Sequence, residues 1–176
     1  RDVAYEIVVA VDDRVPVEEL GDLAAVADRV IRAEFIYPLE ANLDWLNRQA
    51  TGDWILRLDS DDVVSASLIR RLRTPGWDDG ITHAYLQYRW LWGDAATMID
   101  QAPWWPDPVL RLFRNLRGIA TFEHVSHQIP VVAGAAQFWD ESLYHLDLLI
   151  SPPRRRQAKA KAYELDAPGH RTDRGW

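Results

Sequence analysis

Three carboxylates around a serine, Asp59-Ser60-Asp61-Asp62, are the residues of this chain best suited to chemistry, and we refer to them as the acidic tetrad. They follow the mostly apolar, strand-like run Trp54 to Leu58. Oxygen ligands gathered at a strand end suit Mg²⁺ and Mn²⁺, which are readily shared with the phosphates of a substrate. Aspartate and serine also cap helices and form turns, so a cap before the helix predicted over 63–72 is an equally good interpretation of the tetrad alone.

The approach to the acidic tetrad favours the metal interpretation. Ala50-Thr51-Gly52 is typical of a helix end, and the strand that follows delivers the carboxylates to its carboxyl end, where open α/β sheets bind their ligands. A second strand, Tyr5 to Val11, ends in Asp12 and Asp13. The sequence therefore predicts two acidic strand ends and metal-dependent chemistry on a phosphorylated donor.

The elements that must position these acids alternate between strand and helix. Hydrophobic spacing predicts, in chain order, strand 5–11, helix 17–27, strand 29–32, helix 41–50 and strand 54–58. Such alternation implies a parallel, three-layer α/β sheet. The later part is more mixed, with strands at 83–92, 109–114 and 128–132, an ambiguous apolar segment at 142–150 and a basic helix at 154–163. Because no repeat or clear linker is present, the chain is predicted to be one domain, residues 1–176.

Composition narrows the classes of function. With 176 residues and 48% hydrophobic content the chain can bury a substantial core, so extensive disorder is not expected. A formal charge of -7 argues against a nucleic-acid partner, which needs a basic face. The absence of cysteine excludes disulfides and thiolate metal sites. No apolar run reaches membrane-spanning length and no signal-like segment opens the chain, so a cytoplasmic location is expected.

These features resemble the GT-A glycosyltransferases of family 2. The likeness rests on Asp12-Asp13 and on residues 52–62, where a Gly-Asp turn precedes a strand that runs into an Asp-x-Asp motif. It covers residues 5–72 well, and 107–114 and 145–163 more loosely. It implies a GT-A (Rossmann-like) α/β fold, three-layer α/β/α with a mostly parallel central sheet and a more mixed C-terminal half. Residues 1–72 would be the nucleotide-sugar-binding half, and 73–176 the acceptor-side half with a C-terminal basic helix and tail.

The resemblance also implies transfer of a sugar from a nucleoside-diphosphate sugar to a hydroxyl acceptor, a saccharide, lipid or other molecule, with inversion. A divalent cation, Mn²⁺ or Mg²⁺, would neutralise the departing diphosphate. The family's metal site corresponds by position to Asp59, Asp61 and His145, although a lone histidine is more often structural. Asp62 would support the metal ligands or cap a helix. The implied donor-binding residues are Asp12, Asp13, Asp59, Asp61, Arg111 and Arg114.

The general base is the least defined part of this resemblance. Inverting transfer needs a carboxylate that takes the proton of the acceptor hydroxyl. Where many relatives have a His-Glu pair, this chain has His127-Gln128, and glutamine cannot act as a base. Glu123 and Asp107 are therefore the catalytic candidates, with Glu123 preferred because His124 and His127 flank it, although acids in such positions are more often ordinary surface residues. The family's first strand has no counterpart before residue 5, which implies that the sequence is an excerpt.

Two alternatives stay open. A non-catalytic GT-A-like domain that binds a saccharide or nucleotide is favoured by Gln128 and by Leu43-Asp44, which stands where the family often has an Arg-Asn pair. A nucleotidyltransferase would share the sheet and the acidic metal site. That class normally needs a glycine-rich phosphate loop near its start, and this sequence contains none.

Overall fold

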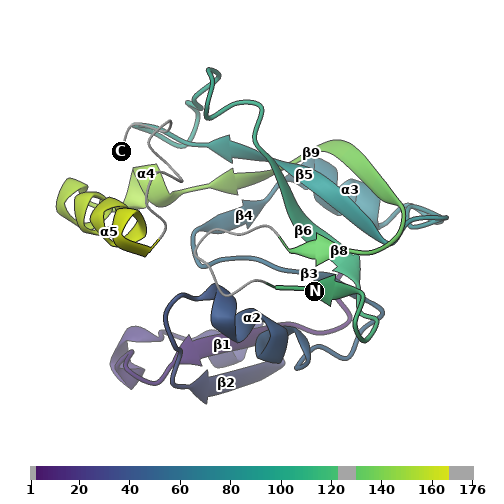
Figure 1. Cartoon of the computed structure of the whole chain (residues 1–176), viewed down its shortest axis with the longest axis horizontal. Coiled ribbons are helices and arrows are strands. Elements are labelled where there is room, and N and C mark those ends of the chain that lie inside the picture. Colours follow the sequence, from purple (N-terminus) through teal and green to yellow (C-terminus); the bar gives the residue numbers. More distant parts are fainter. Residues whose placement is uncertain (1–2, 123–129, 167–176) are drawn as a thin grey trace.

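The computed structural model describes residues 3–122 and 130–166, which form a mixed α/β structure (Figure 1). The strands are β1 (Val8–Asp12), β2 (Arg29–Ala33), β3 (Trp54–Leu56), β4 (Asp62–Val64), β5 (His83–Trp90), β6 (Pro108–Arg114), β7 (Ala120–Thr121), β8 (Val131–Val132) and β9 (Ala136–His145). The helices are the 3₁₀-helix η1 (Val17–Glu19), α1 (Leu23–Val26), α2 (Glu40–Asn47), α3 (Ala66–Leu72), α4 (Asp147–Ile150) and α5 (Pro153–Asp166). Within these described residues, no helix combines the length and the apolar composition of a membrane span.

β1 and β2 form a parallel pair of their own, and both strands agree with the sequence prediction. In Figure 1 this pair lies below the larger sheet, beside α2. The helix predicted over 17–27 is interrupted, because Gly21 has a φ of 56°, a left-handed conformation that favours glycine. The segment therefore divides into η1 and α1, and the Asp22 side chain caps α1 by accepting a hydrogen bond from the Ala25 N–H.

The larger sheet has five strands in the order β3-β6-β5-β9-β4. Here the prediction of a mostly parallel central sheet is wrong, whereas the predicted mixed character of the C-terminal half is confirmed. Among the described strands of this sheet, β5 and β9 run parallel, while β3 with β6, β5 with β6 and β4 with β9 are antiparallel. Alternation of strands and helices suggested that β3 would join β1 and β2. It pairs instead with β6, and local periodicity does not encode that long-range choice.

The helix predicted over 63–72 is a strand followed by a shorter helix. Val63 and Val64 are β-branched and pair with β9, so β4 occupies the start of the segment. α3 then begins after Ser65, whose side-chain oxygen accepts a hydrogen bond from the Leu68 N–H at 3.2 Å. The acidic tetrad consequently joins two strands of one sheet rather than a strand and a helix.

The main hydrophobic core lies where α3 packs against the sheet, with β5 and β9 at its centre. Even-numbered residues of β5 face this core because side chains alternate along a strand. The buried members of the core are Leu68, Ile81, Ala84, Leu86, Tyr88, Trp90, Leu112, Trp139 and Leu143. A smaller cluster of Ile55, Leu110 and Phe113 joins β3 to β6. Both clusters hold the strands that carry the acidic tetrad and His145.

The segment 142–150, ambiguous in sequence, resolves into two elements. β9 continues to His145, and α4 begins at Asp147. The basic helix predicted at 154–163 is confirmed as α5. It is tied to the end of β9 because the Lys159 ammonium donates a hydrogen bond to the Asp147 carboxylate at 2.9 Å.

Leu68 offers a direct test of the core beneath α3. Its side chain is 0% exposed, so Leu68→Ala should lower the free energy of unfolding by about 2–5 kcal/mol through lost burial and a residual cavity. Urea denaturation measures the change. Leu165→Ala on α5 is the control, since Leu165 is 76% exposed and should change stability by less than about 0.5 kcal/mol. Equal losses in the two variants would contradict the packing of α3.

Candidate metal centre

The acidic tetrad forms the turn between β3 and β4. Two hydrogen bonds close the turn: the Asp62 N–H donates to the Asp59 carbonyl at 3.1 Å, and the Asp59 N–H donates to the Asp62 carboxylate at 3.0 Å. β4 pairs with β9 so that Asp62 lies opposite His145, and the Leu146 N–H donates to the Asp61 carbonyl at 2.8 Å. Asp62 and His145, 83 positions apart in the chain, are thereby held side by side.

Asp62 is the buried centre of this arrangement, with a side chain that is 0% exposed. One of its oxygens lies 2.9 Å from Nδ1 of His145, and the other accepts a hydrogen bond from the Tyr88 hydroxyl at 2.9 Å. Because a carboxylate only accepts hydrogen bonds, Nδ1 donates to Asp62, and Nε2 is the ring nitrogen that faces Asp61. Two roles were predicted for Asp62, a support for metal ligands and a helix cap. Asp62 contacts His145, and the residue that caps α3 is Ser65.

The orientation of the His145 ring is fixed on both sides. Tyr88 stacks on it with ring centroids 4.8 Å apart and planes inclined by 18°. Trp90 meets it edge-on, with centroids 4.2 Å apart. Packing and the Asp62 hydrogen bond therefore hold the imidazole in one position, as is common for histidines that bind metals.

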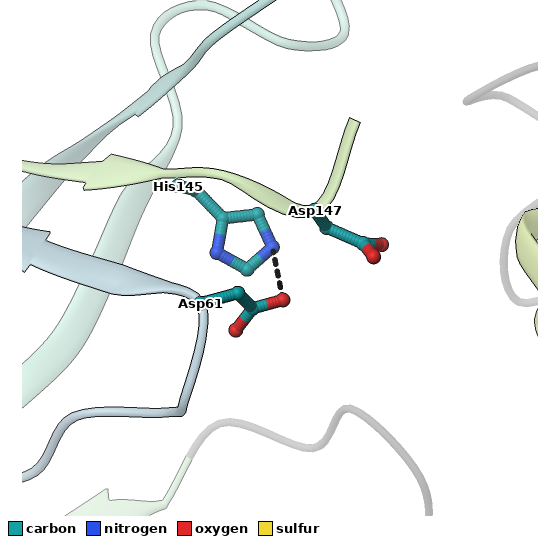
Figure 2. Close-up of side chains that lie close together, drawn as sticks. All are labelled: Asp61, His145 and Asp147. Carbon is teal, nitrogen blue, oxygen red and sulfur yellow. Dashed lines mark ion pairs between the residues drawn. The ribbon is translucent and has the colours of Figure 1, made fainter. Parts of the chain in front are cut away.

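Asp61, His145 and Asp147 form a cluster whose ligand atoms lie within 4.8 Å of one another. Figure 2 shows the His145 ring directed toward Asp61, with Asp147 just beyond the end of β9; His145 Nε2 and an Asp61 oxygen are 3.8 Å apart. Carboxylate oxygens are the ligands that Mg²⁺ and Mn²⁺ prefer, and an imidazole nitrogen is a common ligand of transition metals. Sequence reasoning missed Asp147, and the signal that could have found it is the His-x-Asp spacing at the end of a strand.

The two carboxylates of this cluster differ in their electrostatics. Burial raises the pKa of Asp61, although His145 and Lys159 act in the opposite direction. Burial also disfavours ionised Asp147, but hydrogen bonds from Ser151 at 2.6 Å and Lys159 at 2.9 Å outweigh it and lower the pKa of that carboxyl. A divalent cation would favour ionised Asp61, because its positive charge would compensate for the hydration that the carboxylate loses on burial.

Asp59, predicted as both metal ligand and donor-binding residue, is not a member of the cluster. Its carboxylate lies 2.5 Å from an Arg111 nitrogen, so two of the predicted site residues pair with each other. Burial opposes ionisation of Asp59, but the charges of Arg111 and Arg57 outweigh it and lower the pKa of Asp59. Arg57, which the sequence analysis did not assign, therefore belongs to the surroundings of the tetrad.

Arg114, also predicted to bind the donor, has other partners. Its guanidinium is 3.0 Å from Asp78 and lies over the Trp54 ring, 4.6 Å from the centroid. The register of β5 with β6 shifts between Leu112 and Leu110, so Arg111 is the extra residue of a bulge and the alternation of side chains along β6 is interrupted there. The structure thus places Arg111 beside the acidic tetrad and Arg114 beside Asp78.

Asp12 and Asp13 lie at the end of β1, as predicted, and pair with nearby arginines. Arg14 contacts Asp12 through its backbone and guanidinium, and the side-chain hydrogen bond is the main reason that the pKa of Asp12 is lowered. Asp13 lies 3.8 Å from Arg32. Neither carboxylate is part of the cluster formed by Asp61, His145 and Asp147.

The two candidates for the general base are unequally placed. Asp107 is buried, and one of its oxygens accepts a hydrogen bond from the Trp90 indole at 2.7 Å. Trp90 also contacts His145, so the Trp90 ring links Asp107 to the cluster. Glu123 lies outside the described residues.

The raised pKa of Asp61 predicts a gain of stability on its neutralisation. A carboxyl whose folded pKa exceeds its unfolded value contributes stability that is present below the unfolded value, about 3.9, and is lost as the pH rises through the folded pKa. Metal-free Asp61→Asn should therefore melt at a higher temperature than wild type at neutral pH, and the difference should shrink as the solution is acidified below about pH 4. Thermal denaturation with a chelator present measures it. Asp140→Asn, an exposed position on β9, is the control, and a lower melting temperature for Asp61→Asn would contradict the prediction.

Comparison with known proteins gives no family for this chain. No family model matches it, and no curated protein matches it in sequence. A function for this chain therefore rests on the side chains around the acidic tetrad.

Proposed function

We propose that this protein is a metal-dependent glycosyltransferase of the GT-A type, which moves a sugar from a nucleoside-diphosphate sugar to a hydroxyl acceptor with inversion. The observation that carries the proposal is the cluster of Asp61, His145 and Asp147, with ligand atoms within 4.8 Å of one another. Three protein ligands leave coordination positions for diphosphate oxygens and water, which is how Mg²⁺ and Mn²⁺ usually serve such substrates.

Each residue of the centre has a definite task in this proposal. Asp61 and Asp147 supply oxygen ligands, and His145 supplies Nε2. Asp62 holds the Nδ1 proton and so keeps Nε2 directed at the cluster. When bound, the cation would neutralise the negative charge that develops on the departing diphosphate.

The proposal extends to the finer architecture. The parallel pair β1 and β2, together with α1 and α2, would form the nucleotide-binding side of a three-layer GT-A fold. Asp12 and Asp13 at the end of β1 would then face the nucleoside. Support comes from the parallel register of this pair, which is the arrangement expected where a helix connects consecutive strands.

Binding of a nucleotide sugar without transfer is the second candidate function. The buried state of Asp107 favours it, because this carboxylate is already engaged by the Trp90 indole and would have to leave that hydrogen bond to accept a proton from an acceptor.

Titration of the protein with Mn²⁺, followed by assays with a panel of nucleoside-diphosphate sugars, tests the proposal. We expect Mn²⁺ binding, and release of nucleoside diphosphate from at least one donor only while the metal is present. Activity that persists in a chelator, or a protein that binds no Mn²⁺, would refute the metal-dependent transferase. Metal-dependent binding of a donor with no product from any acceptor would favour the binding domain.

A further inference from the structure

Two arginine side chains lie together beside the acidic tetrad. Arg57 follows β3, and its backbone N–H donates a hydrogen bond to the Arg111 carbonyl at 2.8 Å, which continues the antiparallel pairing of β3 with β6. Residues opposite one another on antiparallel strands place their side chains on the same face. The charge of Arg111 accordingly acts on Arg57, and together with burial, the larger cause, it lowers the pKa of Arg57 to about 10.

The Arg111 guanidinium pairs with carboxylates through one of its two terminal nitrogens. One terminal nitrogen contacts the Asp59 carboxylate and the Tyr88 hydroxyl, and it lies 3.9 Å from Asp62. Its other terminal nitrogen, Nη1, is buried without a hydrogen-bond partner. The guanidinium therefore presents an unused donor.

Arg57 is less well compensated. Its Nε is also buried without a hydrogen-bond partner, and no ion pair joins Arg57 to a carboxylate within residues 3–122 and 130–166. Buried donors are almost always satisfied, and two neighbouring guanidinium groups with unused N–H donors are doubly unfavourable because their charges also repel. An anion would accept hydrogen bonds from both donors and compensate the charge of Arg57.

We propose that Arg57 and Arg111 together form a phosphate-binding site, which holds the diphosphate of the donor. The planar guanidinium fork matches the spacing of phosphate oxygens. Asp59 joins this arginine pair to the candidate metal centre, because it contacts Arg111 and precedes Asp61 by two positions. A diphosphate could then meet the arginines on one side and the cation on the other. This inference rests on the proposed function and adds Arg57, a residue that neither the motif nor the resemblance identified.

Binding of inorganic pyrophosphate in the presence of a chelator tests the arginine site apart from the metal centre. Calorimetry should detect binding to the wild-type protein, and Arg57→Gln should weaken it on the order of tenfold or more. Arg57→Lys should be intermediate, because it keeps the charge and loses the fork. Arg70→Gln on α3, an exposed arginine, is the matched control and should bind pyrophosphate as wild type does.

Melting temperatures measured with and without pyrophosphate provide a second test, which remains valid if a substitution changes the stability of the protein. Because Arg57→Gln removes an uncompensated buried charge, the variant should melt no lower than wild type without ligand. Pyrophosphate should raise the melting temperature of wild type, and at the same concentration it should raise that of Arg57→Gln by clearly less. Equal pyrophosphate affinity in both proteins, or no binding to wild type, would overturn the proposal. Metal-free pyrophosphate binding that depends on Arg57 supports the site even if no sugar transfer is found, so failure of the two proposals is distinguishable.

Discussion

The Asp61→Ala variant is expected to lose Mn²⁺ affinity by more than about 100-fold, because even an outer partner of a metal ligand commonly contributes about 10 to 100-fold. Asp61 supplies one of the two carboxylate oxygens in the cluster. Because burial raises the pKa of Asp61, a bound cation would stabilise the ionised form of this carboxyl. Release of nucleoside diphosphate from the donor should fall in parallel. Calorimetry with Mn²⁺ and a product assay at fixed donor concentration measure the two effects.

Asp140→Ala is the matched control for this variant, since Asp140 lies exposed on the strand that ends in His145. It should retain both Mn²⁺ binding and activity. Unchanged Mn²⁺ affinity in Asp61→Ala would remove Asp61 from the centre. Lost affinity with full activity would show instead that the reaction does not use the metal.

The second large effect concerns stability. Asp62→Ala should lower the free energy of unfolding by about 3–5 kcal/mol, the usual loss when one partner of a buried polar pair is removed. It leaves Nδ1 of His145 and the Tyr88 hydroxyl without their acceptor, and it takes a negative charge away from the Arg111 guanidinium 3.9 Å away. Urea denaturation of the metal-free protein measures the change.

Asp62→Asn separates stability from metal binding. It keeps an acceptor oxygen, so it should destabilise the fold less than Asp62→Ala. It no longer holds the Nδ1 proton as a carboxylate does, and Mn²⁺ affinity should still fall about 10 to 100-fold. If Asp62→Ala unfolds at the same urea concentration as wild type, Asp62 is not the centre of the hydrogen-bond network described above.

Much of the local structure could be predicted from the sequence. β1, β5 and β6 are strongly patterned runs whose alternation or β-branched content indicates strands, and they form close to their predicted bounds. Gly52 before Trp54 correctly placed the start of β3. The stretch 63–72 shows the limit of local reasoning, because Val63 and Val64 fit a helix by spacing and a strand by residue type. Residues 63 and 64 form a strand because they pair with β9.

The residue types of the candidate site could be predicted from the sequence, but the contacts between its residues could not. The acidic residues at 59–62 indicated a metal site and the family resemblance added His145, and Asp61 and His145 do lie in one cluster. The partners depend on register: Arg111 is opposite Arg57, beside Asp59, because β3 pairs with β6. Asp147 was missed because it lies inside an apolar segment whose division into β9 and α4 depends on tertiary packing.

The pairing of β4 with β9 has a consequence for folding. Asp62 and His145 close a loop of 83 positions, and an ion held between Asp61, His145 and Asp147 would fasten that loop in a chain that has no cysteine. Unlike a disulfide, such an ion would leave the unfolded chain unrestricted and would stabilise the folded form by binding to it alone. At an ion concentration about 100 times the dissociation constant, the folded form would gain about 2.7 kcal/mol. The ion that binds the donor would then also stabilise the folded protein, and removing the ion would reverse that stabilisation.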